Sequence, residues 1–192
     1  SCTKVQLSTE GWQIISFNCV GGLSNTFEVL ETAPWETDDK IMTRDPFLKF
    51  ATYDGDKFVG GLINHDQLLP SLGYKIFYTG EPANLTQTGL PQLPVEDVML
   101  RAGWNWIGHA PLDTVDVRDI EAIPFIAGGQ FNTDDQIKTR AGSSLSLTTH
   151  TGKSGPSVWA GNIAQLTPGI GYEVKVAEAL SFCYGTFCSV RA

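Results

Sequence analysis

The sequence predicts an all-β protein with one short helix in each of two tandem repeats. Apolar and polar residues alternate in short runs, which is the period of a half-buried strand. The 192 residues include 20 glycines and 10 prolines but only 2 methionines, a composition that favours strands and turns over helices. The stretch TDDKIMTR beginning at Thr37 returns as TDDQIKTR at Thr133, which indicates an internal duplication.

The duplication extends over most of the chain. GWQIISFN, from Gly11, corresponds to GWNWIGHA, from Gly103. The paired landmarks keep one order along the chain: Trp12 and Trp104, Arg44 and Arg140, Gly73 and Gly171, Tyr74 and Tyr172. We therefore predict a first repeat over 1–92 and a second over 93–192, joined at GLPQLPVED, whose two prolines interrupt regular structure.

The strands follow in order within each repeat. They are expected in KVQL, WQIISF, FLKFATY, KFVGGL and YKIFY, then in DVML, WNWIG, SLSLTTH, VWAGNI and YEVKV. One or two helical turns are expected in TFEVLE, at 26–31, and in VRDIEAI, at 117–123. Each repeat then forms a β-sandwich or a partly open barrel, and the two repeats pack about an approximate twofold axis.

Charge and cysteine content exclude several classes of protein. With 21 acidic and 13 basic residues the net charge is −8, so nucleic acid and anionic membranes are poor partners. No run of about 18 apolar residues occurs, so membrane insertion is not expected. Cys2, Cys19, Cys183 and Cys188 fit either disulfides in an oxidising compartment or free thiols, and the absence of CxxC argues against zinc.

No catalytic constellation is present, so we expect a protein that is not an enzyme and needs no cofactor or metal. His65, His109 and His150 lack any ligand spacing. The doubled acids Asp38–Asp39 and Asp134–Asp135 offer oxygens for calcium. Neighbours in a strand point to opposite faces, which favours a solvated turn instead. Arg44 and Arg140 are expected to pair with an acid or to cover an apolar edge.

The aromatic residues divide into shared and unshared sets. Trp12, Trp104, Tyr74 and Tyr172 recur and are expected in the core, with Gly73 and Gly171 permitting a tight entry into the strand. The unshared set is Trp35, Trp106 and Trp159, of which only Trp159 has a possible counterpart, Phe58. These residues fit either the core or, with Asn105 and Asn162, a surface that binds a sugar or a partner subunit.

The landmarks resemble a family of tandem β modules in secreted and surface proteins of bacteria, with relatives in algae. The family has a GW strand, a strand like GD-x-IKSQ, a strand rich in Phe and Tyr, and then W-x-G-S-L and L-x-PG-x-GY strands. The matching stretches are GWQIISFN, DDKIMTR, FLKFATY, FVGGL and LPSLGYKIF, then GWNWIGHA, DDQIKTR, VWAGNI and LTPGIGYEVKV. The chain departs from this pattern at Phe58, where Trp is usual, and at SLSLTTH, which replaces the aromatic strand. On architecture and size, the chain is also similar to the shell protein around the diatom pyrenoid.

Two functions are consistent with these features. The first is a structural module that associates with itself into a sheet, shell or filament through exposed strand edges such as KVQL, at 4–7, and FCYGTFCSV, at 182–190. The second is a carbohydrate-binding or adhesion module that binds polysaccharide. The resemblance implies a location outside the cell, at its surface, or in a plastid, around the pyrenoid.

Overall fold

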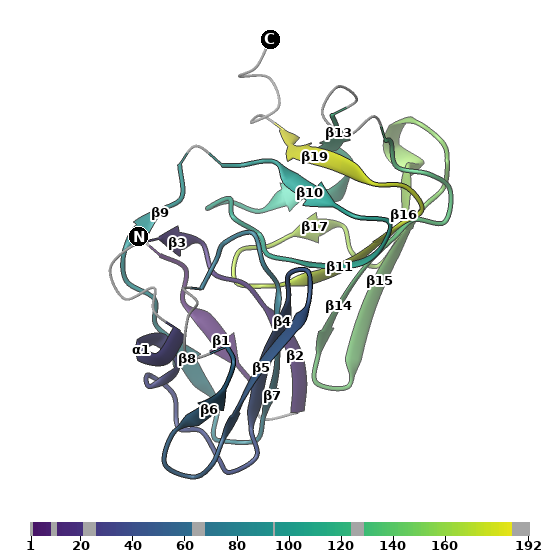
Figure 1. Ribbon diagram of the computed structural model, residues 1–192. Helices are drawn as coiled ribbons and strands as arrows, with labels where there is room; N and C mark the ends of the chain where they lie inside the picture. Colours follow the sequence, from purple (N-terminus) through teal and green to yellow (C-terminus); the bar gives the residue numbers. More distant parts are fainter. Residues whose placement is uncertain are drawn as a thin grey trace.

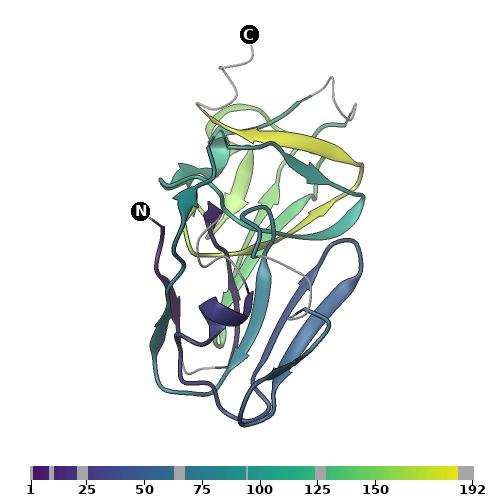
Figure 2. The ribbon, with the colours of Figure 1, turned by 60° about the vertical axis from the view of Figure 1, so that its left-hand side comes forward.

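A computed structural model describes residues 2–8, 11–20, 26–62, 68–93, 95–123 and 129–185, and strands dominate them (Figure 1). The prediction of an all-β class is confirmed. The strands form one large sheet and four small ones, and in this part of the chain no sheet closes into a barrel. In Figure 2 the first half of the chain, in purple and blue, lies below the green and yellow second half.

The large sheet contains strands from both halves. Its main path runs β11 (Gly103–Ile107), β18 (Tyr172–Val176), β14 (Gln136–Ala141), β2 (Gly11–Ile15), β7 (Tyr74–Tyr78), β4 (Lys40–Arg44), β5 (Leu48–Tyr53) and β6 (Phe58–Gly60). A branch from β14 adds β15 (Ser144–His150) and β16 (Trp159–Gly161). The halves join in this sheet where Ala141 of β14 pairs with Gln13 of β2.

Four small sheets cover the cores. They are β10 (Val98–Leu100) with β19 (Leu180–Tyr184) and β13 (Ile120–Ala122), β1 (Val5–Leu7) with β8 (Ala83–Leu85), β3 (Cys19–Val20) with β9 (Leu90–Pro91), and β12 (Val115–Asp116) with β17 (Gln165–Leu166). β19 lies between β10 and β13 in its sheet. The predicted exposed edge at 182–190 is therefore wrong for its first three residues, Phe182–Tyr184, which belong to β19. The rest of that expected edge lies outside the described residues.

Only one of the two predicted helices forms as an α-helix. α1 (Thr26–Leu30) lies within the first predicted stretch. The second stretch gives a 3₁₀ turn, Val117–Asp119, followed by β13, because the Asp116 side chain accepts a hydrogen bond from Arg118 N and the next residues pair with β19. No described helix has the length and apolar character needed to cross a bilayer.

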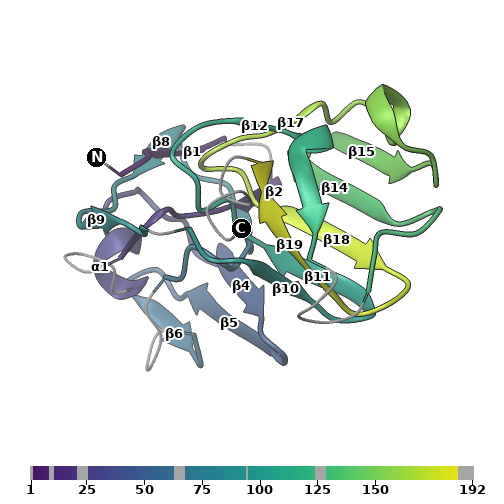
Figure 3. The ribbon, with the colours of Figure 1, turned by 90° about the horizontal axis from the view of Figure 1, so that it is seen from above.

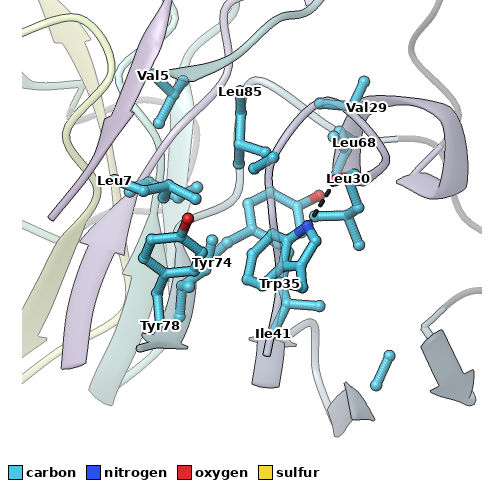
Figure 4. Close-up of a cluster of buried hydrophobic side chains, with 14 of the residues drawn as sticks. Val5, Leu7, Val29, Leu30, Trp35, Ile41, Leu68, Tyr74, Tyr78 and Leu85 are labelled. Carbon is cyan, nitrogen blue, oxygen red and sulfur yellow. Dashed lines mark hydrogen bonds between the residues drawn. The ribbon is translucent and has the colours of Figure 1, made fainter. Parts of the chain in front are cut away.

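Two separate hydrophobic cores lie against the large sheet. The first draws its buried members from Val5 to Leu85, and the second from Val95 to Tyr184. Figure 4 shows the first, where Tyr74 and Tyr78 of β7 meet Trp35 and residues of α1. Ile76 of β7 lies in the same core, and because side chains alternate along a strand, Lys75 and Phe77 face the opposite side of the sheet.

The two halves exchange backbone hydrogen bonds in a reciprocal way. Gly73 N donates to Trp106 O at 3.2 Å, and Gly171 N donates to Ile14 O at 3.0 Å. Isolated bridges follow the same pattern, Leu72 with Ile107 and Ile170 with Ile15. The segment before the Gly-Tyr pair of each half therefore lies along the GW strand of the other half.

Gly73 and Gly171 are required by this crossing. A Cβ on Gly73 would lie 2.7 Å from Ile107 O, and one on Gly171 would lie 2.4 Å from Ile15 O. Neither glycine has a positive φ. The expected reason, a tight entry into the strand, is therefore wrong, and the actual reason is contact with the opposite half.

The doubled acids form turns in which one member is exposed and the other is buried. Asp38 and Asp134 adopt φ values of 75° and 70°. Asp39 is fully buried and accepts from Glu36 N and Thr79 N, both at 3.0 Å. Asp135 accepts from Asn132 N at 2.8 Å and from Ala177 N at 2.9 Å. The expectation of solvated carboxylates is therefore wrong for Asp39 and Asp135, which fasten the turn to the next strand.

The three described cysteines are in disulfides and are not free thiols. Cys2 and Cys19 are bonded and have a Cα–Cα distance of 5.6 Å. Cys183 is also disulfide-bonded. Cys188 lies outside the described residues. The Cys2–Cys19 bond links residue 2 to β3, which pairs with β9.

We expect Gly171→Ala to lower the free energy of unfolding by about 1–3 kcal/mol, because the added methyl group overlaps a backbone oxygen of the other half. Urea denaturation measures this change. Gly61→Ala is the matched control, since no heavy atom lies within 4 Å of its Cβ position. Equal stability of the two variants would contradict the crossing as a tight constraint.

Candidate functional site

The face of the large sheet opposite the two cores carries charged and aromatic side chains. Lys75 lies between the buried Tyr74 and Ile76 on β7, and Glu173 lies between the buried Tyr172 and Val174 on β18. Alternation therefore directs both charged side chains away from the cores. Side chains of the GW strands lie on the same face, which we call the inner face.

An ion cluster at the centre of the inner face connects the two halves. Lys75 Nζ lies 2.5 Å from Glu173 Oε1, and Lys138 Nζ lies 3.4 Å from Glu173 Oε2. In the sheet order β7 and β18 are separated by β2 and β14, which in a flat sheet means about 14 Å, or three strand spacings. Their contact therefore requires the sheet to bend, so that the inner face is concave.

The tryptophans of the GW strands surround the ion cluster. Lys75 Nζ lies 4.3 Å from the centroid of the Trp106 ring, and Lys138 Nζ lies 4.1 Å from that of Trp104. Trp12 packs on Phe77 with centroids 5.3 Å apart. Cation–π contacts of this kind hold a lysine over an aromatic face while leaving the edge of the ring open.

Trp12 and Trp104 are not core residues, contrary to expectation. Trp12 is 37% exposed and Trp104 is half-buried. The reason is the alternation of the GW strands, in which Ile15 and Ile107 face the two cores. The tryptophan that follows each glycine then falls on the inner face.

A pocket of about 520 Å³ opens beside the ion cluster. Trp12, Trp106 and Met42 form its walls, and Lys75 lies among them. Arg44, Pro46, Phe47 and Leu48 complete the lining, and Phe47 is 79% exposed. Arg44 thus lies over an apolar edge, one of its two expected roles. No ion pair joins it to a carboxylate of the described residues. Its counterpart Arg140 is likewise exposed.

Trp35 and Trp159 lie in the cores rather than on a surface. Each is 8% exposed. Trp35 packs edge-on against Phe58 at 4.9 Å and donates from Nε1 to Leu30 O. Trp159 packs edge-on against Phe131 at 5.2 Å. Of the two placements expected for them, core or contact surface, both tryptophans take the core, and of the three unshared tryptophans only Trp106 reaches the inner face.

The two candidate amides are engaged with the backbone. Asn105 Oδ1 accepts from Arg101 N at 2.9 Å, and its Nδ2 donates to Arg101 O at 2.8 Å. Gln13 makes the corresponding pair of bonds with Ser8. Asn162 Oδ1 accepts from Leu147 N at 2.7 Å. These side chains stabilise turns and strand edges, which leaves fewer of their groups for a sugar.

The histidines do not form a reactive group. His109 is fully buried, its Nε2 lies 2.8 Å from Asp113 O, and its ring packs on Tyr184. His150 packs on Trp159. Burial lowers the pKa of both imidazoles. His65 lies outside the described residues, and within those residues no three His, Cys, Asp or Glu side chains are grouped to hold a metal.

The sequence analysis missed Lys75, Glu173 and Phe47, although the first two left a signal. Lys75 follows the first Gly-Tyr landmark, and Glu173 follows the second. In a molecule whose halves are related by a near twofold axis, equivalent positions of opposite charge mark a pair that can meet at that axis. Phe47 gave no comparable signal, because nothing in the sequence orients a loop residue.

Comparison with protein families, with curated proteins and with solved structures gives no match. The resemblance to tandem surface modules therefore stays a prediction, and function must be argued from the geometry.

We expect Lys75→Met to lower the free energy of unfolding by about 1–3 kcal/mol, because it leaves the largely buried Glu173 with only its longer contact to Lys138. A double-mutant cycle with Glu173→Gln should give a coupling energy of about 1 kcal/mol or more. Arg118→Gln, which breaks an exposed pair with Asp116, should cost less than about 1 kcal/mol. Additive effects of the two inner-face substitutions would contradict a direct ion pair.

The lowered pKa of His109 makes the fold less stable in acid. The unfolded chain binds a proton near the ordinary pKa of about 6.5, whereas the folded chain does so only at lower pH. Stability is therefore full above pH 6.5 and falls as the pH drops below it. We expect His109→Gln to reduce the loss of unfolding free energy between pH 7.5 and pH 5, as measured by urea denaturation. His150→Gln should remove a separate part of it. An unchanged pH dependence in His109→Gln would refute this assignment.

Proposed function

We propose that this chain is a non-catalytic structural module that associates with copies of itself into a sheet, shell or filament. The observation that carries the proposal is a pair of exposed apolar strips at equivalent positions of the two halves. Leu48 and Phe50 on β5 are 55% and 52% exposed, and Leu145 and Leu147 on β15 are 50% and 38% exposed. Exposed apolar residues grouped in this way are typical of contact surfaces.

The proposal takes residues 1–92 and 93–192 as repeats of one unit related by an approximate twofold axis. Three sets of matching contacts support it. The crossing at Gly73 has its counterpart at Gly171. Tyr74 Oη accepts from Leu69 N at 2.9 Å, and Tyr172 Oη accepts from Thr167 N at 2.8 Å. The buried carboxylates of Asp39 and Asp135 make matching turns.

The register of the strands makes the two strips equivalent. Leu48 pairs with Arg44 and Phe50 pairs with Met42 across β5 and β4. Leu145 pairs with Arg140, and Leu147 pairs with Lys138, across β15 and β14. In Figure 3, β5 and β15 lie on opposite sides of the molecule. A molecule with two like surfaces on opposite sides joins two neighbours, which is the requirement for an extended assembly.

The ends of the large sheet add a second kind of contact. Within the described residues, β6 pairs only with β5, and β16 pairs only with β15. Each therefore presents an unpaired edge beside its apolar strip. Unpaired edges of this kind can pair with a strand of another molecule. The outer edge of β1, within the KVQL stretch expected from the sequence, offers a further edge, because β1 pairs only with β8 among the described strands.

The alternative of a carbohydrate-binding module stays a prediction from sequence. Burial of Trp35 and Trp159 removes two of its three expected stacking residues. The Cys2–Cys19 disulfide supports an oxidising location, outside the cell, over a reducing plastid stroma.

Sedimentation velocity over a range of protein concentrations, followed by electron microscopy, tests the proposal. We expect the unmodified chain to form extended assemblies. Phe50→Ser or Leu147→Ser alone should limit assembly to small oligomers, because one strip remains. The double variant should form no extended assemblies, because only the strand edges remain for contact.

Met99→Ser is the matched control for this experiment. Met99 is 75% exposed on β10, outside both strips, so its loss should leave assembly unchanged. A chain that stays monomeric at every concentration and salt level would refute the proposal. Normal assembly of the double variant would refute the role of the strips.

A further inference from the structure

The pocket beside the ion cluster has walls of an unusual composition for an exposed site. None of its eight lining residues carries an amide, a hydroxyl or a carboxylate. The walls are two indoles, a phenyl ring and aliphatic side chains, and the polar groups are the cations Arg44 and Lys75. The volume of about 520 Å³ lies within the range of about 300–1,000 Å³ that is usual for small-molecule sites.

The two cations have different roles. The Lys75 ammonium is held by Glu173 and by the Trp106 ring, so its charge is largely balanced. Arg44 is exposed and has no ion pair with a described carboxylate. Arg44 also lines a neighbouring groove together with Asp45, Glu96 and Asp97, whereas no carboxylate lines the pocket itself. On the pocket side, Arg44 thus gives the apolar rim a positive charge that no carboxylate of the lining faces.

We propose that this pocket binds a small organic anion with a flat apolar body, such as an aromatic carboxylate or sulfonate. The body lies between Trp12, Trp106 and Phe47, and the acid group meets the Arg44 guanidinium. A guanidinium binds carboxylate and sulfonate oxygens through paired hydrogen bonds, and indole faces stack on flat rings.

The composition of the lining selects against other ligands. A sugar would bury hydroxyl groups against walls that offer few hydrogen-bond partners, which costs binding energy. A cationic aromatic would be repelled by the charge of Arg44. A neutral aromatic keeps the stacking but loses the contact with Arg44. The pocket therefore discriminates by charge among ligands of one shape.

This binding site shares Leu48 with one of the two strips proposed for self-association. Ligand binding itself needs one molecule only, so it is measured at concentrations where sedimentation shows a monomer. Failure of one proposal then leaves the other standing.

Calorimetric titration with 2-naphthoate tests the site. We expect saturable binding of 2-naphthoate. Neutral 2-naphthalenemethanol and cationic 2-naphthylmethylammonium should bind with lower affinity. Arg44→Gln should weaken binding of 2-naphthoate about tenfold or more. Arg140→Gln is the matched control, because it removes the equivalent arginine of the other half, which does not line this pocket, and it should leave the affinity unchanged.

The indole N–H signals in ¹H–¹⁵N NMR locate the ligand. The chain has five tryptophans, whose signals are assigned by single Trp→Phe variants. We expect 2-naphthoate to shift the signals of Trp12 and Trp106 and to leave those of the buried Trp35 and Trp159 in place. Absence of saturable binding, equal affinity for the neutral probe, or equal effects of Arg44→Gln and Arg140→Gln would each overturn the proposal.

Discussion

The close backbone crossing at Gly73 and Gly171 is the constraint on which the rest of the structure depends. At each crossing the chain before one Gly-Tyr pair runs against the GW strand of the other half, with hydrogen bonds of 3.2 and 3.0 Å. Together with the junction of β14 and β2, where Ala141 pairs with Gln13, these two contacts fix the relative position of the two cores. They also impose the bend that brings β7 toward β18 and makes the inner face concave.

Features of the fold that depend on local sequence could be predicted, whereas features that depend on contacts with distant segments could not. Alternation of apolar residues predicted longer strands such as β7 and β18, because each buries one face. It did not predict two-residue strands such as β3 and β12, which are too short to show a period. Of the one or two helical turns expected at 117–123, only the 3₁₀ turn Val117–Asp119 forms, because the residues that follow pair with β19. Trp12 was assigned to the core because it recurs, yet recurrence fixes a position in the repeat and not the face of the sheet. Trp35 and Phe58 pack together, as do Phe131 and Trp159. Each half thus has one Trp in this pair, but Trp35 precedes β4 whereas Trp159 lies on β16, which hid the core role of both from an alignment.

The central ion pair has a physical explanation if the halves descend from one unit, as we propose. A side chain near a twofold axis meets its own counterpart. Two identical lysines there would repel each other in a partly buried site, and two glutamates would do the same. Lys75 and Glu173 occupy equivalent positions and attract each other. A pair of different residues at this place therefore turns a repulsive contact into a bond between the halves, which only a single chain carrying both copies can achieve.

Comparison of equivalent positions in the two halves shows that one surface is similar in both halves and another is not. The strip of Leu48 and Phe50 keeps its apolar character in Leu145 and Leu147. The pocket does not, because the positions equivalent to Met42 and Phe47 in the strand register hold Lys138 and Ser144. A second charge and a hydroxyl replace two of its apolar walls in the other half. The two halves are thus similar at the strips proposed to contact further copies, and they differ at the pocket proposed to bind a small anion. Each molecule of an assembly would therefore have one such pocket.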